Sequence, residues 1–162
     1  MNIIFCILAA LVCVLLIGMH LYKVYRRKIT SMSFKEAMAL AELPVVTFKC
    51  GDKSVNFILD TGANNSVIHK EIAKKLKLKP TGEKTKITGM ASTVEDVDVA
   101  EIELFHNNKK YKDNVQIVDI GAVLKQIKRT TGVTAHGIIG SGFLANNKYV
   151  LDFKDMIAYS KK

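Results

Sequence analysis

One carboxylate in this chain lies at the junction of a predicted strand and a predicted turn, and the residues on both sides would fix its position for a chemical reaction. Asp60 follows the apolar residues 57–59 and precedes Thr61 and Gly62. A strand that is packed on both faces reads as a continuous apolar run, and a residue at its end is held rigidly while its side chain stays accessible. Gly62 permits a tight turn, and the Thr61 hydroxyl is able to hydrogen-bond within it. The pattern indicates an acid presented for acid–base chemistry; an ordinary Asp-initiated turn is the alternative.

The residues around this turn resemble the active-site loop of retropepsin-like aspartic peptidases. The resemblance covers residues 57–68, which read F-I-L-D-T-G-A-N-N-S-V-I. A second segment, residues 136–144 (H-G-I-I-G-S-G-F-L), resembles the other signature of that family, an apolar pair before a glycine that leads into a short helix. The resemblance implies that Ile138, Ile139 and Gly140 pack beside the Asp60 loop, with the small residue allowing a close approach.

The resemblance also assigns roles to individual residues. Asp60 would be the catalytic acid, and Thr61, Gly62 and Ala63 would support its loop. Contacts to a peptide substrate would come from Asn64, Gly89, Met90, Ile138 and Ile139. Residues 89–92 lie where the family has a flap hairpin over the substrate, and an ordinary hairpin is the alternative there. The implied function is hydrolysis of peptide bonds.

The sequence contains one Asp-Thr-Gly and no internal repeat. Pepsin-like enzymes need two such loops, so the resemblance implies a homodimer in which Asp60 of each subunit meets at the twofold axis. Two carboxylates that lie this close share one proton. One acts as a general base toward a water molecule, and its protonated partner polarises the scissile carbonyl. This chemistry needs no cofactor, and the scattered histidines and cysteines show no spacing typical of a metal site.

Two departures from the viral members of the family occur together. Viral enzymes commonly carry acidic residues where this chain has Asn64 and Asn65, and an arginine where it has Ser141. In those enzymes the arginine pairs with the nearer acid and helps to secure the dimer. Loss of both partners leaves no buried charge unpaired, but it removes one source of dimer affinity. We expect membrane anchoring to offset this loss by raising the effective concentration of subunits.

The N-terminal segment predicts a membrane anchor. Residues 1–22 contain no charged side chain, and about 22 helical residues span about 33 Å, close to the hydrocarbon core of about 30 Å. The basic residues Lys23, Arg26, Arg27 and Lys28 follow at once. This order favours a single spanning helix with the rest of the chain in the cytoplasm. A cleaved signal peptide is the alternative, disfavoured because a basic N-terminal region and a clear cleavage site are missing.

The formal net charge of +9 does not indicate a nucleic-acid partner. Four of the positive charges directly flank the apolar segment, and the others accompany no zinc finger, P-loop or aromatic–basic RNA motif. A solvated, lysine-rich surface is the interpretation. Cys50 is the single cysteine after the apolar segment, which favours a reducing compartment for the domain.

The predicted organisation is an anchor over residues 1–22, a basic flank and linker over 23–43, and a peptidase domain over 44–162. Ser33 and Glu36 form a capping box for a linker helix that ends before Pro44 and lies either on the bilayer or on the domain. From Val45 onward, short runs separated by turns indicate an all-β domain. The resemblance implies that this domain is a single-lobe, retropepsin-like closed β-barrel with one or two short helices. Strands are expected over 45–49, 55–59, 84–88, 94–105, 115–118, 149–153 and 156–159, and helices over 71–78 and 122–129.

Three functional interpretations follow. The first is a membrane-anchored, homodimeric aspartic endopeptidase that acts on a protein near the inner face of the membrane. The second is a non-catalytic module that dimerises or binds peptides by strand addition. The third is a precursor whose linker, residues 30–43, is removed by self-cleavage. The intact Asp60-Thr61-Gly62 favours the first over the second, because a binding module has no need for a costly acid pair.

Overall fold

The computed structural model describes residues 8, 10–21, 32–88 and 94–161. Residues 10–21 are helical. Within the described ranges, no helix is both long and apolar enough to cross a membrane. The rest of the predicted anchor, residues 1–7, 9 and 22, lies outside the described part. The basic residues after it and the predicted substrate-binding residues Gly89 and Met90 also lie outside it.

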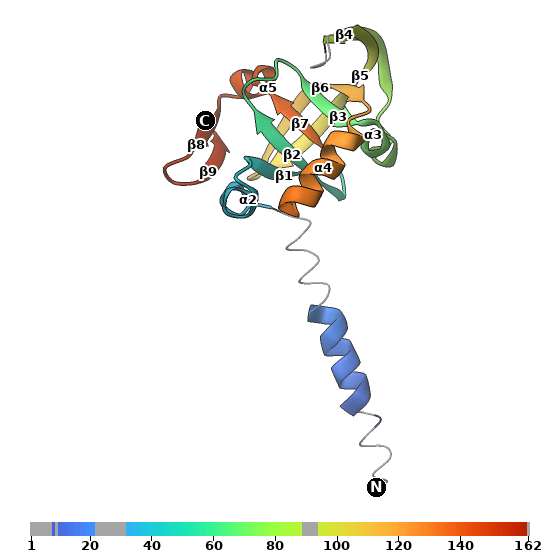
Figure 1. Cartoon of the computed structure of the whole chain (residues 1–162), viewed down its shortest axis with the longest axis vertical. Helices are drawn as coiled ribbons and strands as arrows, with labels where there is room; N and C mark the ends of the chain where they lie inside the picture. Colours follow the sequence, from blue (N-terminus) through green and yellow to red (C-terminus); the bar gives the residue numbers. More distant parts are fainter. Residues whose placement is uncertain (1–7, 9, 22–31, 89–93, 162) are drawn as a thin grey trace.

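Seven strands of the domain form one sheet that closes on itself (Figure 1). The strands are β1 (Val45–Cys50), β2 (Lys53–Asp60), β3 (Ser66–His69), β4 (Pro80–Thr88), β5 (Val94–His106), β6 (Lys109–Val118) and β7 (Gly137–Gly140). Their order is β1-β2-β7-β3-β6-β5-β4, and pairing of Lys49 with Phe105 joins β1 to β5. Six strands therefore make a closed ring, while β4 pairs only with β5 beside it. The predicted all-β closed barrel is confirmed.

The core of the barrel explains the alternating strand patterns. Along β1, Val46 and Phe48 are buried while Lys49 is exposed, as expected where successive side chains point to opposite faces. The Phe48 ring lies at the centre of an aromatic cluster and makes edge contacts with Phe57, Tyr111 and Phe143. Such aromatic pairs contribute about 0.5–1.5 kcal/mol each beyond the area they bury. The strands that carry the site are thereby fixed to one another through their inner faces.

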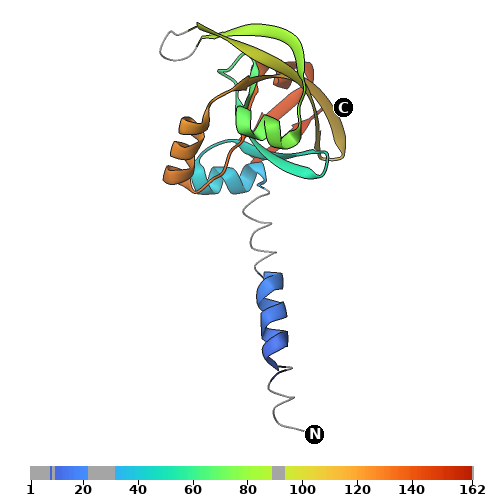
Figure 2. The ribbon, with the colours of Figure 1, turned by 90° about the vertical axis from the view of Figure 1, so that its right-hand side faces the viewer.

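An asparagine pair forms the turn between β5 and β6, and both β4 and β6 begin earlier than expected. Asn107 and Asn108 both adopt positive φ, 49° and 59°, which matches a two-residue hairpin turn of the kind that asparagine tolerates. The turn pairs His106 with Lys109, so β6 begins at Lys109 and runs antiparallel to β5 along its whole length. The expected strand over 115–118 is only its end. Figure 2 shows β4 and β5 as a long ribbon that reaches beyond the ring of strands.

The domain from residue 44 onward has three helices where one or two were expected, and the linker carries a further helix, which was predicted. They are α2 (Phe34–Ala41), α3 (Lys70–Leu76), α4 (Gly121–Thr131) and α5 (Ser141–Asn146). The helix expected over 71–78 ends earlier, because Lys77 takes a left-handed conformation at the C-cap. Gly132 ends α4 in the same way, with φ of 74°.

The linker helix α2 packs on the barrel, which was one of its two predicted placements. Ser33 and Glu36 form the predicted capping box. The face that carries Phe34 and Ala37 is buried, and the Phe34 ring meets Phe153 edge-on at 5.4 Å between centroids. Just before the helix, the Met32 N–H donates to the Thr47 hydroxyl at 2.6 Å. The helix therefore belongs to the folded body of the chain.

The chain ends in a separate two-stranded sheet. It consists of β8 (Tyr149–Asp152) and β9 (Ile157–Ser160), which pair antiparallel with each other. The hairpin lies at the side of the barrel, next to α5 (Figure 1). The side chains of Phe153 and Ile157 at its tip are about half exposed, 53% and 47%.

Candidate active site

The carboxylate of Asp60 stands at the end of a central strand. Strand β2 pairs antiparallel with β1 on one side and parallel with β7 on the other, and Asp60 is in register with Gly140. Leu59 before it is buried, whereas Asp60 is only partly buried and Thr61 after it is exposed. The arrangement is the one predicted, with a buried strand that delivers an acid to the edge of the fold.

The turn after Asp60 folds back onto the carboxylate. The Gly62 N–H donates to Asp60 Oδ1 at 2.8 Å, and the Ala63 N–H donates to the Asp60 backbone oxygen at 3.3 Å. A Cβ atom on Gly62 would lie 3.2 Å from Oδ1 of the same carboxylate, which is tighter than an ordinary contact. The small residue thus lets the backbone amide approach Oδ1 and hold the carboxylate in one orientation.

The loop that follows is tied to the second segment named in the sequence. The Ser141 N–H and hydroxyl both donate to the Ala63 backbone oxygen, at 2.7 and 3.0 Å. The Gly142 N–H donates to the Asn64 backbone oxygen at 3.1 Å. Ser141, which stands where viral enzymes have arginine, therefore secures the loop inside one chain through neutral hydrogen bonds.

Gly140 makes the close approach that the second segment predicts. A Cβ atom at this position would lie 2.6 Å from the Asn65 carbonyl carbon and 2.9 Å from the Ala63 oxygen. Backbone atoms cannot move aside as a flexible side chain does, so no larger residue fits without displacing the loop. Strand β7 lies between β2 and β3, pairing antiparallel with β3, and the Asp60 loop crosses its end. The contact between the two segments is confirmed.

Comparison with known proteins supports the same assignment. Residues 46–143, more than half of the chain, match the family model described as aspartyl protease. The chain belongs to the aspartyl protease family. Among solved structures, the retroviral protease-like domain of Ddi1 from Leishmania major is 15% identical, with 74% of this chain and 89% of that chain covered and a TM-score of 0.49. The EIAV protease in complex with the inhibitor HBY-793 is 21% identical, with 64% and 86% covered and a TM-score of 0.48. No curated protein sequence matches the chain.

The two signature segments of this aspartyl protease family member are joined further from the carboxylate as well. The Asn56 N–H donates to His136 Nδ1 at 2.8 Å, and the His136 N–H donates to the Asn56 oxygen at 2.8 Å. Burial, together with the charge of Lys75, lowers the pKa of His136, so the ring remains a neutral acceptor. The buried Asn56 side chain also accepts from Thr47 at 2.7 Å and donates to the Thr134 oxygen at 2.8 Å. His136 is therefore structural.

The predicted substrate-contact residues fall into three groups. Asn64 is exposed on the loop, with its backbone oxygen taken by Gly142. Ile138 is half-buried, whereas Ile139 is 0% exposed in the core, so in a single chain only Ile138 presents surface to a peptide. Gly89 and Met90 lie outside the described residues. In the described part of the chain, no group of three or more histidine, cysteine or acidic side chains could hold a metal ion.

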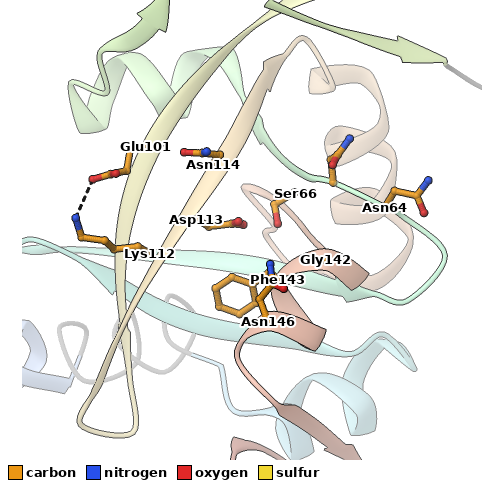
Figure 3. Close-up of a pocket in the computed structure, with 10 residues that line it drawn as sticks. Asn64, Ser66, Glu101, Lys112, Asp113, Asn114, Gly142, Phe143 and Asn146 are labelled. Carbon is orange, nitrogen blue, oxygen red and sulfur yellow. Dashed lines mark hydrogen bonds and ion pairs between the residues drawn. The ribbon is translucent and has the colours of Figure 1, made fainter. Parts of the chain in front are cut away.

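Sequence reasoning missed two polar residues behind the loop. Ser66 is 3% exposed at the start of β3, and its hydroxyl accepts the Gly140 N–H at 3.1 Å. Asp113 on β6 faces Ser66 across a cavity of about 410 Å³ (Figure 3). Asp113 could have been found from its position in β6, because it lies between Tyr111 and Val115 on the face of the strand that points inward. No sequence pattern marked Ser66 beyond its position in the loop motif.

An apolar groove lies on the other side of the loop. It has a volume of about 620 Å³ and begins at Thr61, next to the catalytic candidate. Most of its lining comes from α5 and the C-terminal hairpin: Leu144, Ala145, Tyr149, Val150, Leu151 and Phe153. Ser141 also lines it. The residues that secure the Asp60 loop thus border an apolar surface.

Proposed function

We propose that this protein is an aspartic endopeptidase whose active site consists of Asp60 from each of two identical subunits. The observation that carries the proposal is the geometry of the loop, with a partly exposed carboxylate at the end of a buried strand and one oxygen fixed by the Gly62 amide. Membership of the aspartyl protease family supports the reaction class. A loop so constrained suits an acid whose orientation matters in a reaction.

The chemistry follows from pairing two such acids. Two carboxylates within a few ångströms cannot both ionise cheaply, so the pair holds one proton between them. The ionised Asp60 removes a proton from water as the water attacks the scissile carbonyl, and the protonated Asp60 donates to the carbonyl oxygen. The roles exchange when the amine leaves. The apparent pKa values belong to the pair rather than to either residue.

The groove beside Thr61 supports the homodimer. One subunit supplies one acid in the Asp-Thr-Gly context, so the site is incomplete without a second copy. An apolar surface borders Thr61 and continues to Phe153, which is 53% exposed, and it supports the proposal as a surface that a second copy would cover. Burial of such surface supplies about 25 cal/mol per Å² before the costs of association. This contribution would take the place of the charged pair that viral enzymes use.

We further propose that residues 1–22 anchor the protein in a membrane, with the domain in the cytoplasm. The support is the uncharged segment and the basic cluster after it. Full-length protein should remain in the pellet after alkaline carbonate extraction and dissolve in detergent, whereas protein lacking residues 1–28 should be recovered in the supernatant. Release of the full-length chain by carbonate alone would contradict the anchor.

Peptide cleavage tests the catalytic proposal. Detergent-solubilised full-length protein would be incubated with a mixed peptide library between pH 4 and 8, beside its Asp60→Asn variant. We expect cleavage that is blocked by a statine-type transition-state inhibitor and lost in Asp60→Asn. Asp52→Asn is the matched control, because Asp52 is an exposed aspartate in the β1–β2 turn; it should cleave like the wild type.

Two outcomes would contradict the proposal. Cleavage that persists in Asp60→Asn would place the chemistry elsewhere or in a contaminant. Absence of cleavage in a wild-type protein that is folded and dimeric would favour the non-catalytic peptide-binding module. An N-terminal loss of mass in the wild type that is absent in Asp60→Asn would additionally show self-cleavage in residues 30–43.

A further inference from the structure

Strand β6 carries an acid at a position that its alternation reserves for the interior. Tyr111 and Val115 point inward and are 4% and 0% exposed. Asp113 lies midway between them and so shares their face, while its neighbours Lys112 and Asn114 are exposed. A carboxylate at an inward position costs free energy unless its surroundings use it. The inward position of Asp113 therefore indicates that this residue has a specific role.

The surroundings of Asp113 hold it in place without neutralising its charge. Among the described residues, its Oδ2 is buried and has no hydrogen-bond partner. Burial raises the pKa of Asp113, opposed in part by the Ser66 hydroxyl and the Asn114 backbone amide. The charged groups that line the same cavity are Glu101 from β5 and Lys112 from β6, and they pair with each other at 3.2 Å. The lysine that lines this cavity is thus engaged by Glu101.

Ser66 connects this carboxylate to the catalytic loop. Its hydroxyl accepts the Gly140 N–H at 3.1 Å, and a hydroxyl that accepts one hydrogen bond still has its own proton to donate. Figure 3 shows the Asp113 side chain directed toward Ser66, and an ionised carboxylate is the stronger acceptor for that proton. Gly140 in turn is the register partner of Asp60. The connected groups run from Asp113 through Ser66 and Gly140 to the strand end that carries Asp60.

We propose that Asp113 is a positioning residue for the active site, which orients the Ser66 hydroxyl toward itself and so fixes the Gly140 amide beside Asp60. The inference rests on the proposed function of Asp60. When Asp113 is ionised, the Ser66 proton points to it and the Ser66 lone pairs face Gly140. When Asp113 is protonated, the carboxyl is a weaker acceptor and the Ser66 hydroxyl is free to turn. At acidic pH, the dependence of kcat/KM on pH then reflects the titration of Asp113 as well as that of the Asp60 pair.

The first test needs no enzymatic activity. The Gly140 amide resonance would be followed by two-dimensional NMR from pH 3 to 8 in full-length, detergent-solubilised Asp60→Asn protein, in which the catalytic carboxylate no longer titrates. We expect the resonance to move with a midpoint above the usual range for aspartate. The movement should disappear on adding Asp113→Asn and persist on adding Glu101→Gln, the matched control from the same cavity. Movement that survives Asp113→Asn would overturn the proposal.

The second test uses peptide cleavage. Asp113→Asn should lower kcat about 3–10-fold with little change in KM, and should remove one ionisation from the acidic limb of the kcat/KM profile. Ser66→Ala should do the same, and Ser66→Thr, which keeps the hydroxyl, should recover most of the rate. Glu101→Gln should retain the wild-type profile. An unchanged acidic limb in Asp113→Asn would overturn the proposal.

The two tests separate the two proposals. A wild-type protein without cleavage would contradict the function proposed for Asp60, while the Gly140 titration would still report on the link through Ser66. A wild-type protein that cleaves peptides, with a Gly140 resonance insensitive to Asp113, would keep the function and remove the positioning role.

Discussion

Asp60 and Asp113 are two carboxylates connected through the same loop region, and their settings differ in kind. Asp60 ends a strand, is partly exposed, and has one oxygen held by the Gly62 amide. Asp113 is also partly exposed, but it lies in the middle of a strand, faces inward, and has a buried oxygen without a partner among the described residues. A carboxylate at a strand end is free to meet a second subunit and a substrate. One inside a strand acts only on its neighbours, here through Ser66.

The largest expected effect comes from replacing each carboxylate by its amide. Asp60→Asn should lower kcat/KM by about 10³-fold or more, because the amide neither accepts the proton of water nor shares one with its partner. Asp113→Asn should cost only about 3–10-fold, because it acts through Ser66. Initial rates on one cleaved peptide, at matched concentrations of folded protein, make the comparison. Equal losses of kcat/KM in the two variants would contradict the different roles assigned to Asp60 and Asp113.

The next effect tests the close contact that the loop requires. Gly140→Ala would place a Cβ atom 2.6 Å from Asn65 backbone, so we expect a loss of about 3 kcal/mol in the free energy of unfolding. Gly142→Ala is the matched control, since its Cβ would lie 3.0 Å from a single backbone oxygen of Asn64, and it should cost less. Denaturant unfolding of both variants gives the two values. An alanine at 140 that is tolerated as well as one at 142 would show that the loop is not held in this way.

The third effect is a pH dependence of stability. Burial raises the pKa of Asp113 in the folded chain above its usual value near 3.8, so the folded state binds this proton more tightly than the unfolded state. The stability that Asp113 contributes is present below the unfolded pKa and is lost as the pH rises through the folded pKa. The free energy of unfolding of Asp113→Asn, measured relative to the wild type, should therefore rise between pH 4 and 7. Denaturant unfolding at each pH measures the difference, and a constant difference would contradict the prediction.

The smallest effect concerns the rim of the cavity. Lys112 pairs with Glu101 at 3.2 Å, and both side chains are more than half exposed, 59% and 57%. Such pairs contribute about 0–1 kcal/mol, so Lys112→Ala should change the free energy of unfolding by less than about 1 kcal/mol. Its activity profile should match the wild type. A large loss on this substitution would show that Lys112 compensates the charge of Asp113, contrary to the proposed role.

The sequence was sufficient for the elements that depend on local patterns. The apolar run before Asp60 and the Ser33–Glu36 capping box each have a direct local cause, and each is found in the structure. Close packing of Gly140 on the loop was also predictable, because the resemblance carried a contact between two separated segments. The exact ends of α3 and α4 were not, and they differ from the expected bounds by one or two residues; left-handed residues at Lys77 and Gly132 end the two helices.

The residues behind the loop could not be predicted because their roles depend on register between distant strands. Ser66 and Gly140 are 74 residues apart, and Asp113 meets Ser66 only because β3 pairs parallel with β6, Ser66 opposite Val115. No sequence motif predicts that Ser66 and Asp113 contact each other. Ile139 shows the reverse case. The motif indicated a substrate contact, whereas the register of β7 turns its side chain into the core.

The measurement that tests the central claim most directly is subunit mixing between wild-type and Asp60→Asn full-length proteins, with exchange verified by two affinity tags. If each active site needs Asp60 from both subunits, equal mixing leaves about one quarter of the dimers with two intact acids. Activity at a fixed amount of wild-type protein should then fall to about one half, and to about one quarter at a threefold excess of the variant. Activity that stays constant after verified exchange would contradict a shared site and show that one Asp60 suffices.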